Sequence, residues 1–145
     1  MASILVDTNL LVYAYDPRDP AKNVQAQTIL KALHEHKIGY LSVQSLAEFI
    51  NASRKLAIPI ATALSYTQAF ALSWPILDLT PQVVMEAGRG VRDHLLPYYD
   101  AQIWATARLN QIPVLFSEDF NSGSTLEGIR FVNPFAAGFR LEEWL

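Results

Sequence analysis

The sequence predicts a layered α/β/α fold around a central parallel β-sheet, and two observations support this prediction. Short apolar runs typical of buried strands alternate with longer segments whose apolar residues recur at helical spacing. Capping residues such as Asp7 and Asp19 stand where one pattern gives way to the other. Alternating strands and helices favour parallel pairing, because parallel strands need a crossover connection that is usually helical.

The first half of the chain contains two expected strands and four expected helices. Residues 4–6 form an apolar run typical of a strand buried on both faces, and capping side chains then introduce a short helix over 10–14. A longer helix follows Asp19 and Pro20, since proline is favoured in the first helical turn. The other expected elements are a strand over 38–41, a helix over 42–56 that stops near Pro59, and a helix over 61–74 that is apolar over much of its circumference.

The second half continues the alternation. Ile76 and Leu77 form a short expected strand, and Pro81 begins a helix whose middle is weakened by Gly88 and Gly90, which we interpret as a kink or break. The remaining expected elements are a helix over 98–110 after Pro97, a strand over 113–116, a loop rich in Ser, Asn and Gly over 117–128, and a strand over 129–132 closed by Asn133 and Pro134.

Length and composition indicate one domain over residues 1–145. A chain of this length buries roughly 70% of its unfolded surface, which suffices for a core without cross-links. The absence of cysteine excludes disulfides, thiolate metal sites and a cysteine nucleophile. The net charge of −3 lacks the basic excess of most nucleic-acid-binding proteins. The sequence has no basic, apolar leader and no apolar run of about 18 residues, so we expect a cytoplasmic protein.

Four carboxylates stand at junctions between the expected strands and helices. Asp7 directly follows the first strand, and Asp119 follows the strand over 113–116 by two residues. Asp100 lies in the first turn of a helix, and Glu48 lies early in another. Because the carboxyl ends of parallel strands and the following helix N-termini share one edge of a sheet, these side chains are expected to converge there.

Convergence of four carboxylates has a chemical consequence. Clustered carboxylates repel one another, so they hold protons or bind a cation. A set of oxygen ligands without cysteine or suitably spaced histidine favours Mg²⁺ or Mn²⁺ over zinc. The reaction that such a site supports is metal-assisted hydrolysis of a phosphodiester.

Each carboxylate also has a purely structural interpretation. Asp7 can cap the helix that follows it, and Asp119 can be an ordinary loop or capping residue. Asp100 shares a helical stripe with Trp104 and therefore points toward the core side, where its structural alternative is a favourable interaction with the helix N-terminus. Glu48 lies away from the apolar stripe of its helix, a position where a solvated glutamate is usual.

The motifs around these acids resemble the ordered acidic motifs of PIN domains. They are Val6-Asp7-Thr8-Asn9, Ser45-Leu46-Ala47-Glu48-Phe49, the segment Tyr98 to Ala107 with Asp100, and Leu115 to Asp119. The closing segment from Phe131 to Phe135 is similar to one subgroup of the small ribonucleases of the VapC toxin type. The resemblance runs from about Ile4 to Phe135, and the joint order and spacing of the motifs make it specific.

This resemblance implies a three-layer PIN-like fold and an endoribonuclease that hydrolyses single-stranded RNA with Mg²⁺ or Mn²⁺. It implies that the acidic and metal-binding roles belong to Asp7, Glu48, Asp100 and Asp119, with Asn9 and Ser117 as assisting polar residues. Glu118 directly precedes Asp119 and is the alternative source of the fourth carboxylate, although the motif register favours Asp119.

The resemblance also implies partners. Proteins of this type are usually homodimers, and many are toxins of type II toxin–antitoxin pairs in which an antitoxin segment lies across the active-site groove. The apolar helix over 61–74 is a candidate for such an interface, and ordinary core packing is its alternative interpretation.

Other hydrolytic designs lack their residues here. The sequence has no Gly-x-Ser-x-Gly elbow, no Gly-x₄-Gly-Lys-Ser/Thr loop and no Gly-x-Gly-x-x-Gly motif. An aspartyl-phosphate phosphatase starting at Asp7 would want a second aspartate where Asn9 stands. A metal-free ribonuclease would need two of His34, His36 and His94 to converge. The main rival is a catalytically silent PIN-like module that binds RNA or protein, which has no reason to retain four repelling acids.

Contacts to RNA are less well specified. The candidates for phosphate contacts and base stacking are Arg54, Lys55, Arg89, Arg92, Arg108, Tyr98 and Tyr99, with surface solubility as the alternative. Of the 14 acidic residues, four belong to the proposed metal site, so the rest nearly balance the 11 basic residues. The net negative charge is therefore weak evidence against a nucleic-acid substrate.

Overall fold

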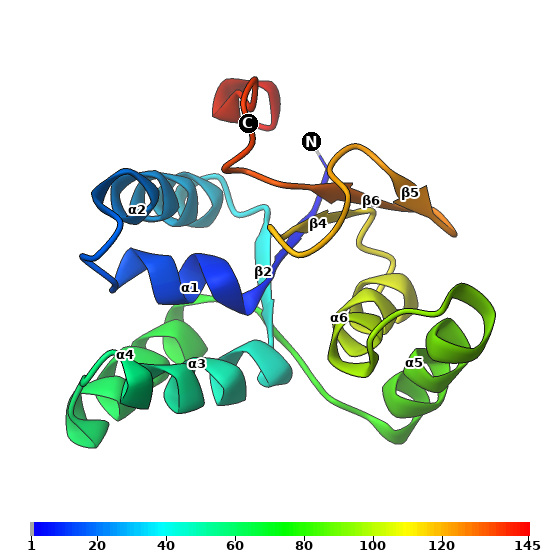
Figure 1. The fold of residues 1–145 in the computed structure, drawn as a ribbon, viewed down its shortest axis with the longest axis horizontal. Helices are drawn as coiled ribbons and strands as arrows, with labels where there is room; N and C mark the ends of the chain where they lie inside the picture. The colour runs from blue at the N-terminus through cyan, green and yellow to red at the C-terminus, as the bar shows by residue number, and fades with distance from the viewer. Residues whose placement is uncertain (1) are drawn as a thin grey trace.

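Six strands form one mostly parallel sheet in the computed structural model, which describes residues 2–145 (Figure 1). The strands are β1 (Ile4–Val6), β2 (Gly39–Ser42), β3 (Ile76–Leu77), β4 (Val114–Phe116), β5 (Thr125–Leu126) and β6 (Ile129–Val132), in the spatial order β3-β2-β1-β4-β6-β5. All neighbouring pairs are parallel except β5 with β6. The predicted parallel α/β sheet is therefore confirmed, with one antiparallel strand added at an edge.

Six α-helices connect these strands. They are α1 (Thr8–Ala14), α2 (Pro20–Glu35), α3 (Val43–Lys55), α4 (Ile60–Ser73), α5 (Pro81–His94) and α6 (Tyr98–Leu109), and a short 3₁₀ helix, η1 (Leu141–Glu143), lies near the C-terminus. Side-chain caps begin several of them: Asp19 accepts from Lys22 N at α2, and Thr80 accepts from Val83 N at α5. No helix in residues 2–145 combines the length and hydrophobicity that a membrane span requires.

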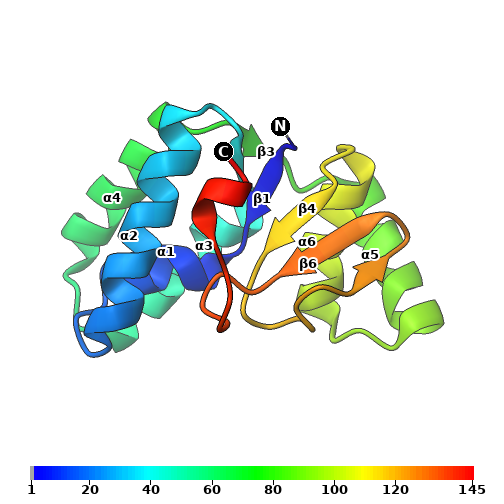
Figure 2. The ribbon, with the colours of Figure 1, turned by 90° about the horizontal axis from the view of Figure 1, so that it is seen from above.

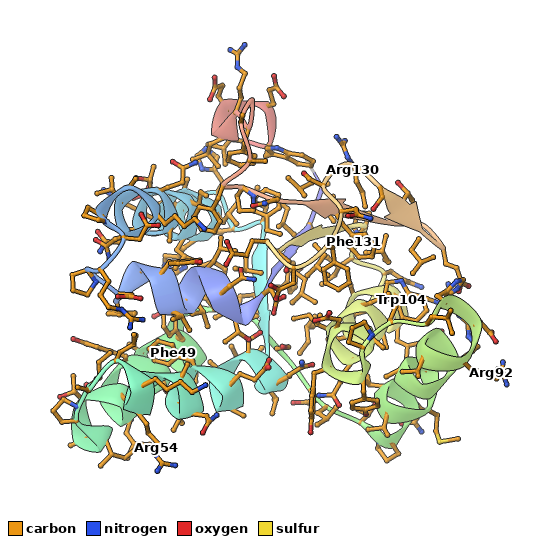
Figure 3. All side chains as sticks on the ribbon, viewed as in Figure 1. Phe49, Arg54, Arg92, Trp104, Arg130 and Phe131 are labelled. Atoms are coloured by element: carbon orange, nitrogen blue, oxygen red, sulfur yellow. The ribbon has the colours of Figure 1, made fainter. Side chains whose placement is uncertain are left out.

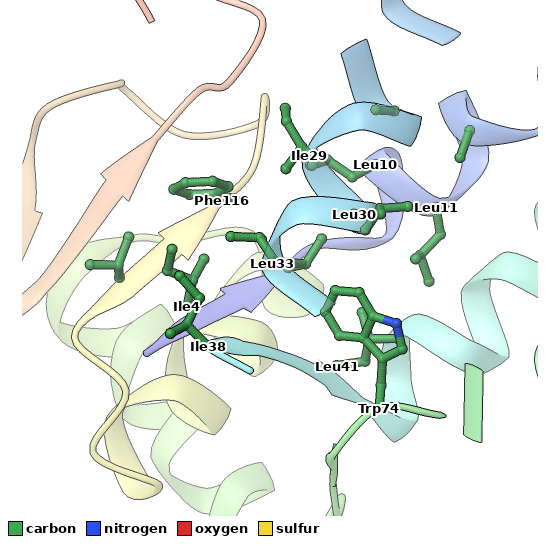
Figure 4. Packing of buried hydrophobic residues seen from close by; sticks show 14 of the residues in the cluster. Ile4, Leu10, Leu11, Ile29, Leu30, Leu33, Ile38, Leu41, Trp74 and Phe116 are labelled. Carbon is green, nitrogen blue, oxygen red and sulfur yellow. The ribbon is translucent and has the colours of Figure 1, made fainter. Parts of the chain in front are cut away.

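The helices cover both faces of the sheet and create two cores, because successive strand residues point to opposite faces. Ile4 and Val6 of β1 face the first core, while Leu5 between them faces the second. In Figure 2, α1 to α4 lie on one side of the strands, and α5 and α6 lie on the other. The first core includes Ile4, Val6, Leu10, Leu11, Ile29, Leu33, Phe49 and Phe116, and the second includes Leu5, Val83, Ala101, Ile103, Trp104, Leu115 and Phe131. Figure 4 shows the first core around Ile4, Leu33 and Phe116.

The structure differs from the expectations at β5, inside the segment expected to be a loop over 117–128. Leu126 pairs with Ile129 across a two-residue turn, so β5 and β6 form a tight hairpin. Both turn residues have positive φ, 46° at Glu127 and 86° at Gly128. This backbone is what a two-residue hairpin turn requires, and the glycine at its second position supplies it without strain.

The expected break at Gly88 and Gly90 is absent, because α5 runs without interruption from Pro81 to His94. Gly90 is instead needed for close helix packing. A Cβ atom at Gly90 would lie 2.8 Å from Cζ3 of the fully buried Trp104 of α6. A Cβ atom at Gly88 would meet no atom within 4 Å. Packing thus requires glycine at position 90 but not at position 88.

The apolar helix α4 divides its side chains between the core and the surface. Tyr66 and Phe70 pack against the first core, where Tyr66 stacks on Tyr15 with ring centroids 4.2 Å apart. Leu64 and Leu72 lie on the exposed part of the same helix. Core packing therefore explains one side of α4, and the other side is a free apolar surface in this chain.

Candidate active site

Asp7 lies at the carboxyl end of β1 and serves as the N-cap of α1. Its Oδ1 accepts a 2.7 Å hydrogen bond from the backbone N–H of Thr8, and its Oδ2 accepts a 2.7 Å hydrogen bond from Ser117 Oγ. Its own N–H donates to the carbonyl of Phe116 on β4. The capping interpretation of Asp7 is thus borne out, and both carboxylate oxygens are fixed at the junction of β1 and β4.

Ser117 is the centre of a hydrogen-bond network at this edge of the sheet. Its hydroxyl is fully buried, donates to Asp7, and accepts from the backbone N–H of Asp119 at 3.1 Å and from Asn9 Nδ2 at 3.3 Å. One donor and two acceptor positions exhaust what a hydroxyl offers. Asn9 Nδ2 also reaches Asp119 Oδ2 at 3.3 Å. The serine therefore holds Asp7, Asn9 and the Asp119 loop in one arrangement.

Glu48 joins this group from α3 on the first-core side of the sheet. Its Oε1 accepts a 2.9 Å hydrogen bond from Thr8 Oγ1, which connects α3 to the start of α1. Thr8 is a site residue that the sequence reasoning missed. Its signal was its place directly after Asp7, where its hydroxyl shares the edge of the sheet with the carboxylate.

Asp100 enters from the first turn of α6, on the second-core side. Its side chain is partly buried and has no hydrogen-bond partner in residues 2–145. Burial raises the pKa of Asp100, and the negative charges of Asp119 and Glu48 raise it further. The carboxylate is therefore held near two other carboxylates without a counter-charge.

The pKa of Asp7 is also raised. Burial is the main cause that raises its pKa from 3.8 to about 7, and the charges of Asp119 and Glu48 add to the rise. The hydrogen bonds from Ser117 and Thr8 act in the opposite direction, since they stabilise the ionised form. Asp119 and Glu48 thus lie within electrostatic reach of both Asp7 and Asp100 at one edge of the sheet.

Glu118 points elsewhere. Its Oε1 accepts a 2.6 Å hydrogen bond from the Tyr13 hydroxyl, and its Oε2 pairs with Lys22 Nζ at 3.0 Å. Lys22 Nζ also lies over the Tyr13 ring, 4.8 Å from its centroid. Lys22 thus pairs with Glu118, whereas the charge of Asp119 acts on Asp7 and Asp100, which supports the motif register that favours Asp119.

The donor chemistry of this cluster suits a hard cation. No three acidic or histidine side chains among the described residues are already arranged to hold a metal ion. The set nevertheless consists of carboxylate oxygens from separate segments, and Asn9 Oδ1 is buried with no hydrogen-bond partner. Mg²⁺ keeps several waters and contacts few protein oxygens directly, and a donor set made only of oxygens suits Mg²⁺ or Mn²⁺ better than zinc.

A groove of about 630 Å³ adjoins Glu48 between α3 and the start of α6. Its lining includes Val43, Leu79, Tyr98 and Tyr99, which are all partly exposed. The two tyrosines proposed to stack on bases therefore lie beside the carboxylate cluster.

The proposed phosphate contacts divide into two groups. Arg89 and Arg108 pair with Glu86 at 2.5 Å and 2.7 Å. Arg92 pairs with the neighbouring Asp93, 2.7 Å away. Arg54 and Lys55 are exposed at the end of α3, without an ion pair within residues 2–145, and Arg54 projects from the surface (Figure 3). Only this second group is free of carboxylate partners.

The histidines do not form a catalytic pair. His94 Nε2 lies 2.6 Å from Glu127 Oε2, at the turn between β5 and β6. His34 instead stacks on Trp74 on the first-core side, with ring centroids 5.9 Å apart.

Comparison with known proteins agrees with this geometry. A family model for the PIN domain matches residues 4–122. No curated protein matches the sequence. Similar solved structures include a toxin–antitoxin complex from Klebsiella pneumoniae, with 20% identity, a TM-score of 0.68, and coverage of 92% of this chain and 98% of that chain.

Two further structures share the fold. VapC20 of Mycobacterium tuberculosis, described as a sarcin-ricin loop cleaving toxin, has 22% identity and a TM-score of 0.67 over 86% of this chain and 98% of its own. DNA-bound VapBC from Salmonella typhimurium has 19% identity and a TM-score of 0.64 over 90% of this chain and 97% of its own. Since the family match spans most of the sequence and includes all four acids, the chain belongs to the PIN domain family.

Proposed function

We propose that this protein is an endoribonuclease that hydrolyses phosphodiester bonds of single-stranded RNA with Mg²⁺ or Mn²⁺. The observation that carries the proposal is that Asp119 and Glu48 lie within electrostatic reach of both Asp7 and Asp100, so that burial and then these charges raise the pKa values of Asp7 and Asp100. Membership of the PIN domain family supports it. A binding module would gain nothing from this repulsion, whereas a cation would relieve it.

The four carboxylates are the proposed ligands, with Asn9 Oδ1 available beside them. A divalent cation in this place supplies positive charge to the phosphodiester and makes water a better nucleophile. The protein contributes pre-arranged donors: Ser117 and the Thr8 N–H hold Asp7, and the Thr8 hydroxyl holds Glu48. A carboxylate fixed in this way needs little reorganisation when substrate arrives.

Asp7 gains and loses a proton in the neutral pH range when no cation is bound. With a pKa of about 7, its carboxyl group carries a proton part of the time at neutral pH. Binding a cation must displace this proton, because carboxylate ligands bind metal in their ionised form. Cleavage is therefore expected to rise with pH through the neutral range.

We further propose that the enzyme is the toxin of a type II toxin–antitoxin pair and forms a homodimer. The support is the likeness in fold to the Klebsiella pneumoniae toxin–antitoxin complex, to the VapBC complex of Salmonella typhimurium and to the sarcin-ricin loop cleaving toxin of Mycobacterium tuberculosis. The exposed apolar side of α4, with Leu64 and Leu72, is available for a protein partner.

A cleavage assay on varied single-stranded RNAs tests the catalytic proposal. The parent protein should cut with Mg²⁺ or Mn²⁺ and not with EDTA, and Asp100→Asn should abolish cutting with the fold retained by circular dichroism. Asp78→Asn is the matched control, since Asp78 is an exposed aspartate outside the cluster. Equal rates for Asp100→Asn and the parent would reject the metal site. An inert parent that co-purifies with a partner would favour the binding module.

A further inference from the structure

Two buried glutamines connect the helices that carry Glu48 and Asp100. Gln102 Nε2 on α6 donates a 3.0 Å hydrogen bond to Gln44 Oε1 on α3, and Gln44 Nε2 donates a 2.9 Å hydrogen bond to the carbonyl of Tyr99. The two side chains are only 5% and 7% exposed. Within residues 2–145, both hydrogen bonds between α3 and α6 pass through Gln44.

The packing of the two helices gives this connection its importance. Phe49 anchors α3 in the first core, while Ala101 and Ile103 anchor α6 in the second core. Figures 1 and 2 show the two helices in different layers, on opposite sides of the strands. Hydrophobic packing therefore holds each helix against its own face of the sheet, and the glutamines link one helix directly to the other.

Each glutamine lies within four residues of a carboxylate on the same helix. Gln44 is four residues before Glu48, so the two side chains share one face of α3. On α6, Tyr99 directly precedes Asp100, and Gln102 follows it by two residues. A change in the length or direction of this bridge would therefore alter the separation of the two carboxylates.

The bridge has a defined polarity. The Tyr98 hydroxyl donates a 2.9 Å hydrogen bond to Gln102 Oε1, so the donors run from Tyr98 through Gln102 and Gln44 to the Tyr99 carbonyl. Rotating the Gln44 amide by half a turn would bring its NH₂ group against the NH₂ group of Gln102 and its oxygen against the Tyr99 carbonyl. Only one arrangement of the amides satisfies the whole chain.

Stability alone does not account for such a bridge. Replacing both partners of a buried hydrogen bond by apolar groups of the same shape can leave stability nearly unchanged. An apolar pair does not fix the relative position of the two helices, because dispersion contacts depend little on direction. A hydrogen-bonded amide pair does fix this position, because its hydrogen bonds are directional.

We propose that Gln44 and Gln102 are positioning residues that set the separation of Glu48 and Asp100 and thereby the affinity for a divalent cation. This inference rests on the proposed function, since the cation site is what the bridge serves. The side chains of the pair need not touch the cation or the RNA; their effect passes through the two helices.

The test is a double-mutant cycle of Gln44→Met and Gln102→Met, with Mn²⁺ binding measured by calorimetry. Each single variant should bind Mn²⁺ roughly 10- to 100-fold more weakly, the range typical for groups that orient metal ligands. The double variant should bind no more weakly than the worse single variant, because either change breaks the same bridge. Ser53→Ala is the matched control, because Ser53 is a buried polar residue of α3 whose hydroxyl donates within its own helix, to the Phe49 carbonyl.

A distance measurement separates this inference from the proposed function. The chain has no cysteine, so spin labels at Lys55→Cys on α3 and Leu109→Cys on α6 would be unique, and both positions are exposed. The distance distribution should broaden in Gln44→Met and stay narrow in Ser53→Ala.

Each outcome has a definite reading. If the parent binds Mn²⁺ and the Met variants bind it equally well, the positioning role is wrong and the proposed function stands. The role is also wrong if affinity falls while the distance distribution stays unchanged. If the parent itself binds no Mn²⁺, the proposed metal site is wrong and the inference falls with it.

Discussion

Replacing Asp7 with asparagine should make the metal-free protein more stable at alkaline pH while abolishing RNA cleavage. Burial, helped by the charges of Asp119 and Glu48, raises the pKa of Asp7 from 3.8 to about 7. The folded protein then binds a proton more tightly than the unfolded chain does. Its free energy of unfolding therefore falls as pH rises from 3.8 to about 7, and asparagine avoids this loss because it carries no charge.

The magnitude follows from the size of the pKa change. At about 1.4 kcal/mol per unit, the rise corresponds to about 4 kcal/mol of lost stability above pH 7. Asp7 is only 5% exposed, so solvent screens little of this. Against it, an asparagine amide would face the Ser117 hydroxyl, whose acceptor positions are taken by Asn9 and Asp119. That mismatch costs about 1–2 kcal/mol, which leaves a net gain of about 2–3 kcal/mol at alkaline pH.

Urea unfolding in EDTA at pH 8 and pH 4.5 measures this difference. The advantage of Asp7→Asn over the parent should shrink by about 3 kcal/mol between pH 8 and pH 4.5, because the parent carboxyl group becomes protonated. Adding Mn²⁺ at pH 8 should stabilise the parent and leave the variant unchanged, since a ligand stabilises only the state that binds it.

Asp78→Asn provides the control, because it removes an exposed aspartate with the same change in formal charge. Its stability should follow that of the parent at both pH values. The electrostatic account of Asp7 is refuted if Asp7→Asn is less stable than the parent at pH 8. It is equally refuted if the difference between the two proteins does not depend on pH.

Three further predictions test the surroundings of the site and the packing of the helices. Ser117→Ala removes a hydrogen bond that lowers the pKa of Asp7. Mn²⁺ titrations at several pH values should therefore show that the pH at which binding is half-maximal moves upward. An unchanged or lower pH of half-maximal binding contradicts the hydrogen-bond account. Asp119→Asn should reduce kcat/KM by more than about 10-fold, whereas Glu118→Gln should change it far less, and the reverse order would assign the fourth carboxylate to Glu118. Gly90→Ala should destabilise the protein by about 1–3 kcal/mol in urea unfolding, because its Cβ would press on a buried indole ring. Gly88→Ala, in open space on the same helix, should stabilise it by about 0.5–1 kcal/mol, and equal effects at both positions would refute the packing argument.

Local patterns predicted the strands and helices well because each signal lies within a few residues. The apolar run before Asp7 marked β1 and its end, and proline marked the start of α2 and α5. β5 was missed because two residues are too few to show alternation. Its hairpin depends on the positive φ angles of Glu127 and Gly128. The surrounding Ser, Asn and Gly residues are typical of a loop, so the composition did not indicate a strand.

The site was predictable only in part, because several of its contacts join residues that are far apart in the sequence. The parallel pattern implied that Asp7 and Asp119 would share one edge of the sheet, and the pairing of β1 with β4 in the structure makes their strands neighbours. The pattern of α3 favoured solvent for Glu48, and its hydrogen bond with Thr8 joins residues 40 positions apart. The ion pair between Arg89 and Glu127 spans 38 positions and likewise has no local signal. Contacts of this kind arise from tertiary packing.

The balance at Asp7 bears on the choice between a nuclease and a silent module. Its charge is destabilising in the folded chain, and the hydrogen bonds from Ser117 and Thr8 offset only part of the rise in its pKa. An uncharged side chain of the same shape would serve as the cap of α1 and join β1 to β4 with less loss of stability. The charge therefore has no structural benefit at this place. The proposed cation, bound by Asp7 together with Glu48, Asp100 and Asp119, would give the charge a function, and this is why stability and cleavage should respond in opposite directions when the charge is removed.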